Sequence, residues 1–233
     1  MSTDRPTLLL LPGLLNDAEL WHAQRADLAD VADCVVGDLT HGDSLSALAT
    51  QLLAQMPPQF ALAGFSLGGY VAQELLRIAP ERVERLALLD TSARADSPER
   101  AAQRRAQEAS VRAGSTFVGF GERLMRQYVH PSRWQDAALL ARVRDMTQRL
   151  GVEVFLRQNR LEREDGRALL RAYTRPVLVL CGQDDVITPP ALHEEMAALA
   201  PHAQLVQVPE CGHLSPLEQP QAVTAALRAW LLA

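Results

Sequence analysis

Lysine is missing from this sequence, and all 23 basic residues are arginine. Without lysine, the chain cannot form a Schiff base on a lysine amine. It also cannot bind nucleotide phosphates through the lysine of a P-loop. The absence of one residue type therefore excludes two classes of chemistry.

Cysteine is scarce, because the sequence contains only Cys34, Cys181 and Cys211. An odd number of cysteines without paired spacing favours reduced thiols over a disulfide framework. A metal site formed by Cys181, Cys211 and His213 is an alternative, but the two thiols lie at the ends of different predicted strands and lack C-x-x-C spacing. We therefore interpret these thiols as lining of the core or of a pocket, and we expect no metal.

Long hydrophobic runs are also absent. No run approaches the roughly 18 apolar residues of a membrane helix. The first apolar run follows a polar start and has about five residues, fewer than the roughly seven to fifteen in the core of a signal peptide. We therefore expect a cytoplasmic protein with no membrane partner.

The overall charge is moderate. Charged residues make up 22% of the chain, and the net charge is −5. This balance argues against a nucleic acid bound through the overall charge of the protein. We expect a small-molecule substrate and no nucleic-acid partner. For the oligomeric state, a homodimer is one alternative.

Short apolar runs alternate with longer amphipathic stretches along most of the chain. A chain of 233 residues, 48% of them hydrophobic, is long enough for one large domain or for a core with an inserted piece. Continuously apolar runs are typical of strands that are covered on both faces in a parallel sheet. The pattern predicts a doubly wound, mostly parallel α/β sheet of about six strands. These strands are expected at residues 7–13, 33–39, 60–66, 83–90, 176–182 and 203–210.

One segment, residues 94–172, breaks this alternation and has the spacing of successive amphipathic helices. We expect it to form a helical cap inserted into a core made of residues 1–93 and 173–233. The segment carries 16 arginines against 10 acidic residues, a net charge of +6, whereas the rest of the chain carries −11. A solvated polar face is the ordinary interpretation of this excess, and arginines that face an anionic substrate are the alternative.

A G-x-S-x-G pattern, Gly64-Phe65-Ser66-Leu67-Gly68, lies between the third predicted strand and a predicted helix. This context is typical of a nucleophile elbow, in which a serine on a tight turn displays its hydroxyl at the edge of the sheet. A glycine-rich packing turn is the alternative. The stretch is not a dinucleotide-binding motif, because Ser66 stands where the middle glycine of G-x-G-x-x-G is required.

A serine nucleophile needs a base that takes its proton and an acid that orients the base. Ligands of an open α/β sheet bind beyond the carboxyl ends of the strands. Asp184 and Asp185 follow the fifth predicted strand and His213 follows the sixth, which gives the expected order of serine, acid and histidine. For the other histidines a surface position is the better interpretation; they lie at positions 22, 41, 130, 193 and 202.

The chain resembles the α/β-hydrolase fold enzymes of the capped esterase and lactonase type. Five motifs carry the resemblance, in the family's order: "LLLLPGLLND", "GDLTHGDS", "AGFSLGGYVA", "LVLCGQDDVITPP" and "ECGHLSPLEQP". The resemblance implies that Ser66 is the nucleophile and His213 the base. It implies Asp185 as the acid, because the G-x-x-D-x-x-x-P pattern of the family places its aspartate there. Asp184 is a close competitor, and Asp90 is another, because some relatives take the acid from the end of the fourth strand.

The resemblance further implies an oxyanion hole formed by the backbone N–H groups of Leu14 and Leu67. The sequence departs from the family where Pro12-Gly13 replaces a histidine–glycine pair, and in a shortened N-terminal part that leaves a reduced core. The implied activity is hydrolysis of a small carboxylic ester or lactone through an acyl-enzyme intermediate, without a cofactor. Use of the same three residues for carbon–carbon bond hydrolysis or for a lyase reaction is the alternative.

The cap is expected to roof the substrate pocket. Its few aromatic residues are candidate pocket walls, although packing between helices is the more ordinary role; they are Phe117, Phe120, Tyr128, Trp134 and Phe155. If arginines of the cap reach the site, a carboxylate-bearing substrate such as a dicarboxylic enol-lactone is favoured.

Overall fold

A six-stranded sheet organises the described part of the chain. The computed structural model describes residues 5–113 and 119–233. The strand order is β2-β1-β3-β4-β5-β6, and every neighbouring pair is parallel. The predicted doubly wound parallel α/β sheet is therefore confirmed. The strands are β1 (Thr7–Leu11), β2 (Asp33–Val36), β3 (Phe60–Phe65), β4 (Val83–Leu89), β5 (Val177–Gly182) and β6 (Ala203–Val208).

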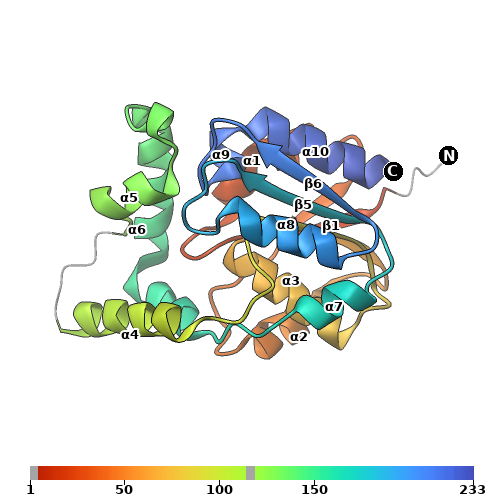
Figure 1. Ribbon diagram of the computed structural model, residues 1–233, viewed down its shortest axis with the longest axis horizontal. Coiled ribbons are helices and arrows are strands. Elements are labelled where there is room, and N and C mark those ends of the chain that lie inside the picture. The colour runs from red at the N-terminus through yellow and green to blue at the C-terminus, as the bar shows by residue number, and fades with distance from the viewer. Residues whose placement is uncertain (1–4, 114–118) are drawn as a thin grey trace.

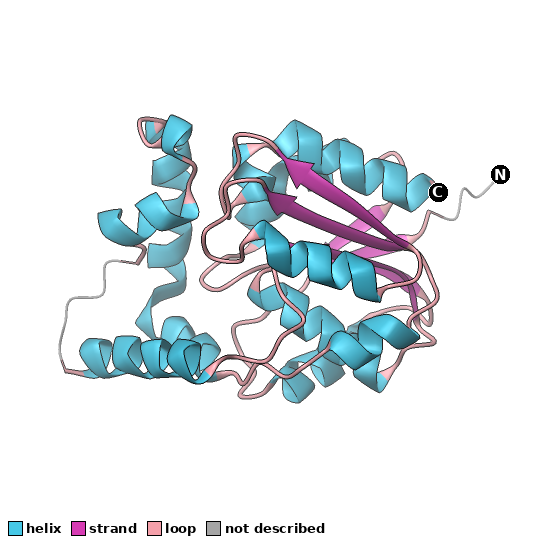
Figure 2. Ribbon diagram, in the orientation of Figure 1, coloured by secondary structure: helices cyan, strands magenta, loops and turns pink. Residues whose placement is uncertain are grey.

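Helices cover both faces of the sheet (Figures 1 and 2). One face packs against η1 (Ala18–Trp21) and α10 (Pro220–Leu232). On the same side, α1 (His22–Asp27) packs against α10, and the short α9 (Ser215–Glu218) precedes α10. The other face packs against α2 (Leu45–Gln55), α3 (Leu67–Ile78) and α8 (Pro190–Leu199). No helix in residues 5–113 or 119–233 is long and apolar enough to cross a membrane.

The alternation of side chains along β1 shows how one apolar run serves two cores. Leu8 and Leu10 belong to the cluster that contains Trp21 and Trp230, whereas Leu9 and Leu11 belong to the cluster under α2 and α3. Successive side chains of a strand point to opposite faces, so a continuous run of leucines is buried on both sides.

The two edge strands differ from the sequence prediction. Residues of β2 alternate between exposed and half-buried, and β6 is buried only at Val208. The sequence predicted that all six strands are covered on both faces, and this prediction is wrong for β2 and β6. An edge strand has a neighbouring strand on one side only and lies at the limit of each helical layer.

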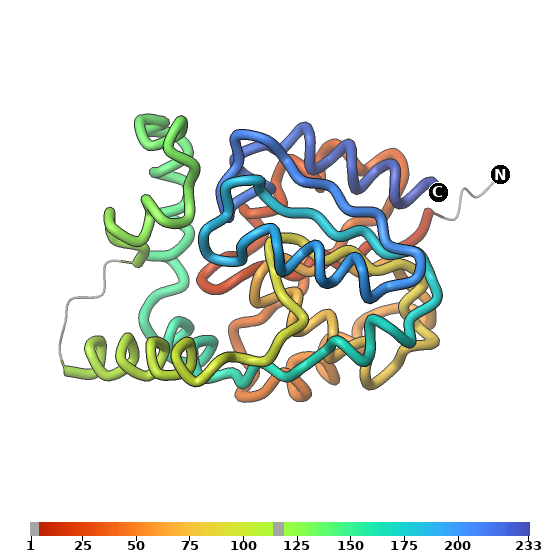
Figure 3. Tube along the Cα trace, in the orientation of Figure 1, coloured from red at the N-terminus to blue at the C-terminus, as the bar shows by residue number. Residues whose placement is uncertain are grey.

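Among the described residues, four α-helices lie between β4 and β5, within residues 94–172, a range that we call the inserted segment. The segment's α5 and α6 stand beyond the arrowheads of β5 and β6 (Figure 2), and the Cα trace shows this part of the chain to one side of the rest (Figure 3). By contrast, α7 packs against α3 and α8. The division into core and cap stays a prediction. The helices are α4 (Pro98–Arg112), α5 (Glu122–Tyr128), α6 (Ala137–Arg160) and α7 (Arg167–Ala172), with a short η2 (Pro131–Arg133) between α5 and α6.

Candidate active site

Ser66 occupies a strained turn between β3 and α3. Its φ of 51° and ψ of −114° lie outside the regions that side-chain-bearing residues favour. The turn is fixed by the Ser66 N–H, which donates to the Leu89 carbonyl at 2.9 Å, and by the Thr91 hydroxyl, which donates to the Ser66 carbonyl at 2.8 Å.

The flanking glycines permit this turn. A Cβ on Gly64 would lie 2.4 Å from the Gly68 carbonyl oxygen, and a Cβ on Gly68 would lie 2.4 Å from the Leu11 carbonyl oxygen. Both contacts involve backbone atoms, which cannot move aside as a flexible side chain can. The glycines of the G-x-S-x-G pattern are therefore required by the close approach of the β1 loop, β3 and α3.

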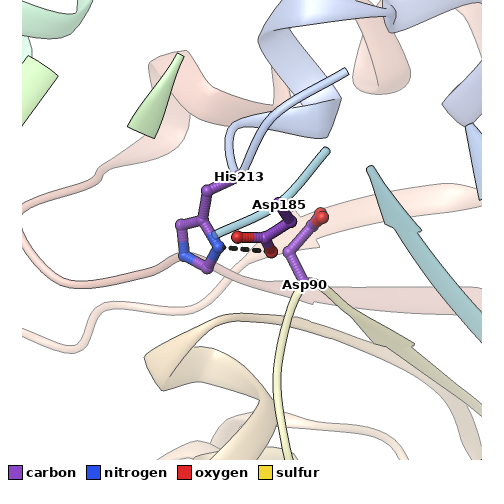
Figure 4. Close-up of side chains that lie close together, drawn as sticks. All are labelled: Asp90, Asp185 and His213. Atoms are coloured by element: carbon purple, nitrogen blue, oxygen red, sulfur yellow. Dashed lines mark hydrogen bonds and ion pairs between the residues drawn. The ribbon is translucent and has the colours of Figure 1, made fainter. Parts of the chain in front are cut away.

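Three side chains that are distant in the sequence form a hydrogen-bonded chain. His213 Nε2 lies 3.0 Å from the Ser66 hydroxyl oxygen, and His213 Nδ1 lies 2.8 Å from Asp185 Oδ2. An ionised carboxylate can only accept, so the Nδ1–H donates to Asp185 and Nε2 is left to accept from the Ser66 hydroxyl. The side chains of Asp185 and His213 are fully buried, and Figure 4 shows the imidazole directed at the Asp185 carboxylate.

Asp185 is held by donors in addition to His213. Backbone N–H groups of Ile187 and Thr188 donate to Oδ1 at 2.8 and 3.0 Å, and the Thr188 hydroxyl donates to Oδ2 at 2.7 Å. Burial alone would raise the pKa of Asp185, but His213 and the hydrogen bonds from Thr188 hold this pKa below its ordinary value. The carboxylate therefore stays ionised beside the imidazole.

Asp184, the close competitor, lies elsewhere. Its side chain is 51% exposed, and its carboxylate is 3.5 Å from Nε2 of His130. The structure thus brings Asp185 to His213 and leaves Asp184 at the surface.

Asp90 lies next to the same cluster without bonding to His213 (Figure 4). It is fully buried, its Oδ1 accepts from the Gly182 N–H at 3.0 Å, and its Oδ2 is hydrogen-bonded to the Ser215 hydroxyl. Burial, followed by the charge of Asp185, raises the pKa of Asp90 well above its ordinary value. The surroundings of Asp90 therefore favour its protonated form more than water does.

Metal binding is a weaker explanation of this cluster. Ligand atoms of Asp90, Asp185 and His213 lie within 4.8 Å of one another. Among the described residues, however, both oxygens of each carboxylate already have hydrogen-bond partners. A polar network accounts for the cluster without an ion.

The two residues expected to supply oxyanion donors lie at the same cavity as the serine. Leu14, Ser66 and Leu67 line a cavity of about 200 Å³. Leu67 opens α3, and Leu14 lies in the loop after β1. A side chain of the inserted segment fixes that loop: the Leu15 N–H donates to the side-chain oxygen of the buried Gln158 at 2.8 Å.

The aromatic residues predicted as candidate pocket walls lie in different places. Tyr128 lines the cavity with Ser66, and its ring packs edge-on against His213 at 5.0 Å between centroids. Phe120 and Phe155 are buried and line a neighbouring cavity. Trp134 is 39% exposed, and Phe117 lies outside the described residues.

Two buried residues were not expected from the sequence. The Glu218 carboxylate accepts from the N–H groups of His130 and Leu214, at 2.7 and 3.0 Å, and so holds the loop that carries His213. His193 accepts from the Thr91 N–H at 3.0 Å and is completely buried, so the surface position predicted for it is wrong. Burial lowers the pKa of His193 to about 4, which keeps the ring neutral.

Comparison with known proteins places this chain in a family. The model of the alpha/beta hydrolase family matches residues 8–227. The chain belongs to the alpha/beta hydrolase family. As an alpha/beta hydrolase, it is an enzyme of the hydrolase superfamily, in agreement with the sequence prediction.

Relatives of this alpha/beta hydrolase include esterases. A pimeloyl-[acyl-carrier protein] methyl ester esterase from Nitrosomonas europaea is 29% identical over 96% of this chain and 95% of its own length. The structure of a thermophilic esterase from Thermogutta terrifontis, solved with malate bound, is 34% identical, with a TM-score of 0.87 over 98% of this chain and 91% of that one. An enol-lactonase from Burkholderia xenovorans, 22% identical, shares the fold with a TM-score of 0.80 over 100% and 94% of the two chains.

Proposed function

We propose that this alpha/beta hydrolase cleaves small carboxylic esters or lactones through an acyl-enzyme intermediate on Ser66. The observation that carries the proposal is the chain of hydrogen bonds from Ser66 through His213 to Asp185, with distances of 3.0 and 2.8 Å. This arrangement supplies a nucleophile, a base within reach of its proton, and an acid that orients the base. The esterases among the relatives support the choice of an ester as substrate.

The first half of the reaction acylates the serine. His213 Nε2 takes the Ser66 proton while the hydroxyl oxygen attacks the carbonyl carbon of the ester. The N–H groups of Leu14 and Leu67 stabilise the negative charge that develops on the carbonyl oxygen. The carbon–oxygen bond of the ester then breaks, and the imidazolium gives its proton to the leaving alcohol. Asp185 stabilises the transient imidazolium and keeps the imidazole in the tautomer that can accept from serine.

The second half releases the acid. His213 takes a proton from a water molecule, the resulting hydroxide attacks the acyl carbon, and the bond to Ser66 breaks as its oxygen regains the proton. In a lactone the leaving alcohol stays attached to the acyl group, so the released product is a single hydroxy acid. The inserted segment roofs this site in the proposal, because Tyr128 and residues of α4 line the cavity that contains Ser66.

A serine-reactive fluorophosphonate probe tests the nucleophile. We expect labelling of the native protein and of Ser46→Ala, a control at an exposed serine of α2, but none of Ser66→Ala. In a panel of short-chain aryl esters and lactones, Ser66→Ala should lower kcat by about 10⁴-fold or more. Labelling that persists in Ser66→Ala would refute the assignment. Labelling of native protein without turnover of any ester would favour carbon–carbon bond hydrolysis or a lyase reaction.

A further inference from the structure

Three arginines share the cavity with Ser66. Arg100 and Arg104 come from α4, and Arg163 follows α6; we call these residues the arginine cluster. Among the described residues that line the cavity, Asp96 alone is acidic. The lining therefore carries a net charge of +2 if all four groups are ionised. A cavity of one predominant charge beside a nucleophile selects substrates by charge.

The partners within the cluster do not neutralise it. Arg104 forms an ion pair with Asp96 and donates to the carbonyls of Asn159 and Leu161. Its Nε has no hydrogen-bond partner among the residues that the structure describes. The single carboxylate of the cavity is therefore already engaged by one of the three guanidinium groups.

Within the described part of the chain, the other two guanidinium groups are bonded only to neutral partners. Arg100 donates to the Ile187 carbonyl at 3.2 Å. Arg163 donates to the carbonyls of Gln158, at 3.3 Å, and Leu161. Neither forms an ion pair within residues 5–113 and 119–233. A carbonyl satisfies a donor but leaves the positive charge uncompensated.

The surroundings of Arg163 disfavour its positive charge. Burial and the neighbouring charge of Arg104 lower the pKa of Arg163 to about 10. The guanidinium therefore remains protonated at neutral pH, although its environment opposes the charge. The charge of a bound anion would offset this effect, because an opposite charge nearby favours the protonated guanidinium.

Other arginines of the inserted segment behave differently, which makes the cluster specific. Many pair with a carboxylate at or near the surface, as the interpretation of a solvated face predicts. Those pairs are Arg112–Glu108, Arg126–Glu122, Arg133–Asp136, Arg142–Glu19, Arg149–Asp17, Arg160–Glu108 and Arg167–Asp165. Only a few of the arginines of the inserted segment thus line the cavity.

We infer that the substrate carries a carboxylate, separate from the ester or lactone carbonyl, which binds at Arg100 and Arg163 while the carbonyl faces Ser66. The inference rests on the proposed hydrolysis and narrows its substrates to half-esters or lactones of dicarboxylic acids, or esters of hydroxy acids. Planar guanidinium groups match a carboxylate in geometry as well as charge. The cavity volume of about 200 Å³ suits a substrate of a few carbon atoms.

A matched set of esters tests the charge preference. Monomethyl esters of dicarboxylic acids with four to seven carbons are compared with the same esters in which the free carboxyl is an amide. Acetyl esters of short hydroxy acids form a second arm, which places the carboxylate on the alcohol half instead. In one of the two ester series, we expect kcat/KM for the carboxylate form to exceed kcat/KM for its amide by about tenfold or more. This factor is the effect of a charge-assisted hydrogen bond. This ratio should shrink at high salt.

Variants then assign the preference to residues. Arg163→Gln and Arg100→Gln should each lower the carboxylate-to-amide ratio by about tenfold. Arg105→Gln, an exposed arginine of α4 outside the cavity lining, should leave the ratio unchanged. Because each ratio compares two substrates of the same enzyme, a general loss of folded protein cancels.

Equilibrium binding gives a readout that needs no turnover. Calorimetry on Ser66→Ala should detect glutarate but not its monoamide, and addition of Arg163→Gln should weaken glutarate binding by about tenfold. Turnover of carboxylate and amide esters at equal kcat/KM would overturn the inference and leave the proposed hydrolysis intact. Failure of every ester, together with absence of fluorophosphonate labelling, would instead refute the proposed hydrolysis and the inference with it.

Discussion

Asp184 and Asp185 are adjacent in the chain, yet only Asp185 faces His213. The difference arises in the turn that follows β5, where the Asp185 side chain accepts from the backbone of Ile187 and Thr188. A carboxylate that caps the turn after its own residue is fixed in direction, in this case toward the interior. The preceding side chain then points outward, where Asp184 lies 3.5 Å from the ring of His130.

Asparagine substitutions at these two positions test the assignment of the acid. Asp185→Asn should lower kcat by up to about 10⁴-fold, because the amide can donate to Nδ1 and so favours the wrong imidazole tautomer. Asp184→Asn is the matched control and should retain native kcat. Both are measured on the best ester of the panel, with circular dichroism to check folding. Equal activity of the two variants would mean that neither aspartate orients His213.

At the scale of elements, α6 consists of two helical parts that meet at a kink. Its first part buries Leu139, Val143 and Met146, and its last turns bury Phe155 and Gln158. Gly151 separates the parts with φ 76° and ψ −177°, a combination that glycine alone adopts readily. The kink therefore sets the direction in which Gln158 reaches the loop after β1.

Gly151→Ala tests this kink. A Cβ at position 151 would meet no atom within 4 Å, so the expected cost is conformational strain of about 1–3 kcal/mol. At about 2–4 °C per kcal/mol for a chain of this size, the loss should be visible in thermal unfolding. Glu153→Ala, an exposed change on the same helix, is the control. A Gly151→Ala protein as stable as the native one would mean that the turn tolerates a side chain.

The sequence predicted the elements well because each element has a local pattern. All six strands form, and most end slightly earlier than predicted, since loop residues such as Pro12-Gly13 extend the apolar run. Ser66, Asp185 and His213 could be found because each follows the carboxyl end of a strand, where a parallel sheet gathers its loops.

Supporting residues carried no such local signal. Gln158 bonds to a backbone N–H 143 residues away, and Glu218 to one 88 residues away. Helical periodicity tells which side of a helix is buried but does not name the partner across the interface. The same limit applies to the arginine cluster, since a count of arginines cannot tell which of them line a cavity.

At the scale of the whole molecule, two buried groups oppose each other in their effect on stability. Burial raises the pKa of Asp90, so the folded chain retains a proton that the unfolded chain releases, and this favours unfolding as pH rises. Burial lowers the pKa of His193 from 6.5 to about 4, so the unfolded chain binds a proton that the folded chain excludes. The second effect favours unfolding as pH falls.

His193→Gln isolates the second effect. In the native protein this histidine should reduce the free energy of unfolding progressively as pH falls from about 6.5 to about 4, by up to about 3 kcal/mol in total. Glutamine can still accept from the Thr91 N–H but does not titrate, so the loss of stability over this range should be smaller in the variant. Urea unfolding at several pH values measures it, with His202→Gln, an exposed histidine, as control. Parallel curves for native protein and His193→Gln would contradict a buried neutral ring, whereas a difference that grows as pH falls would support it.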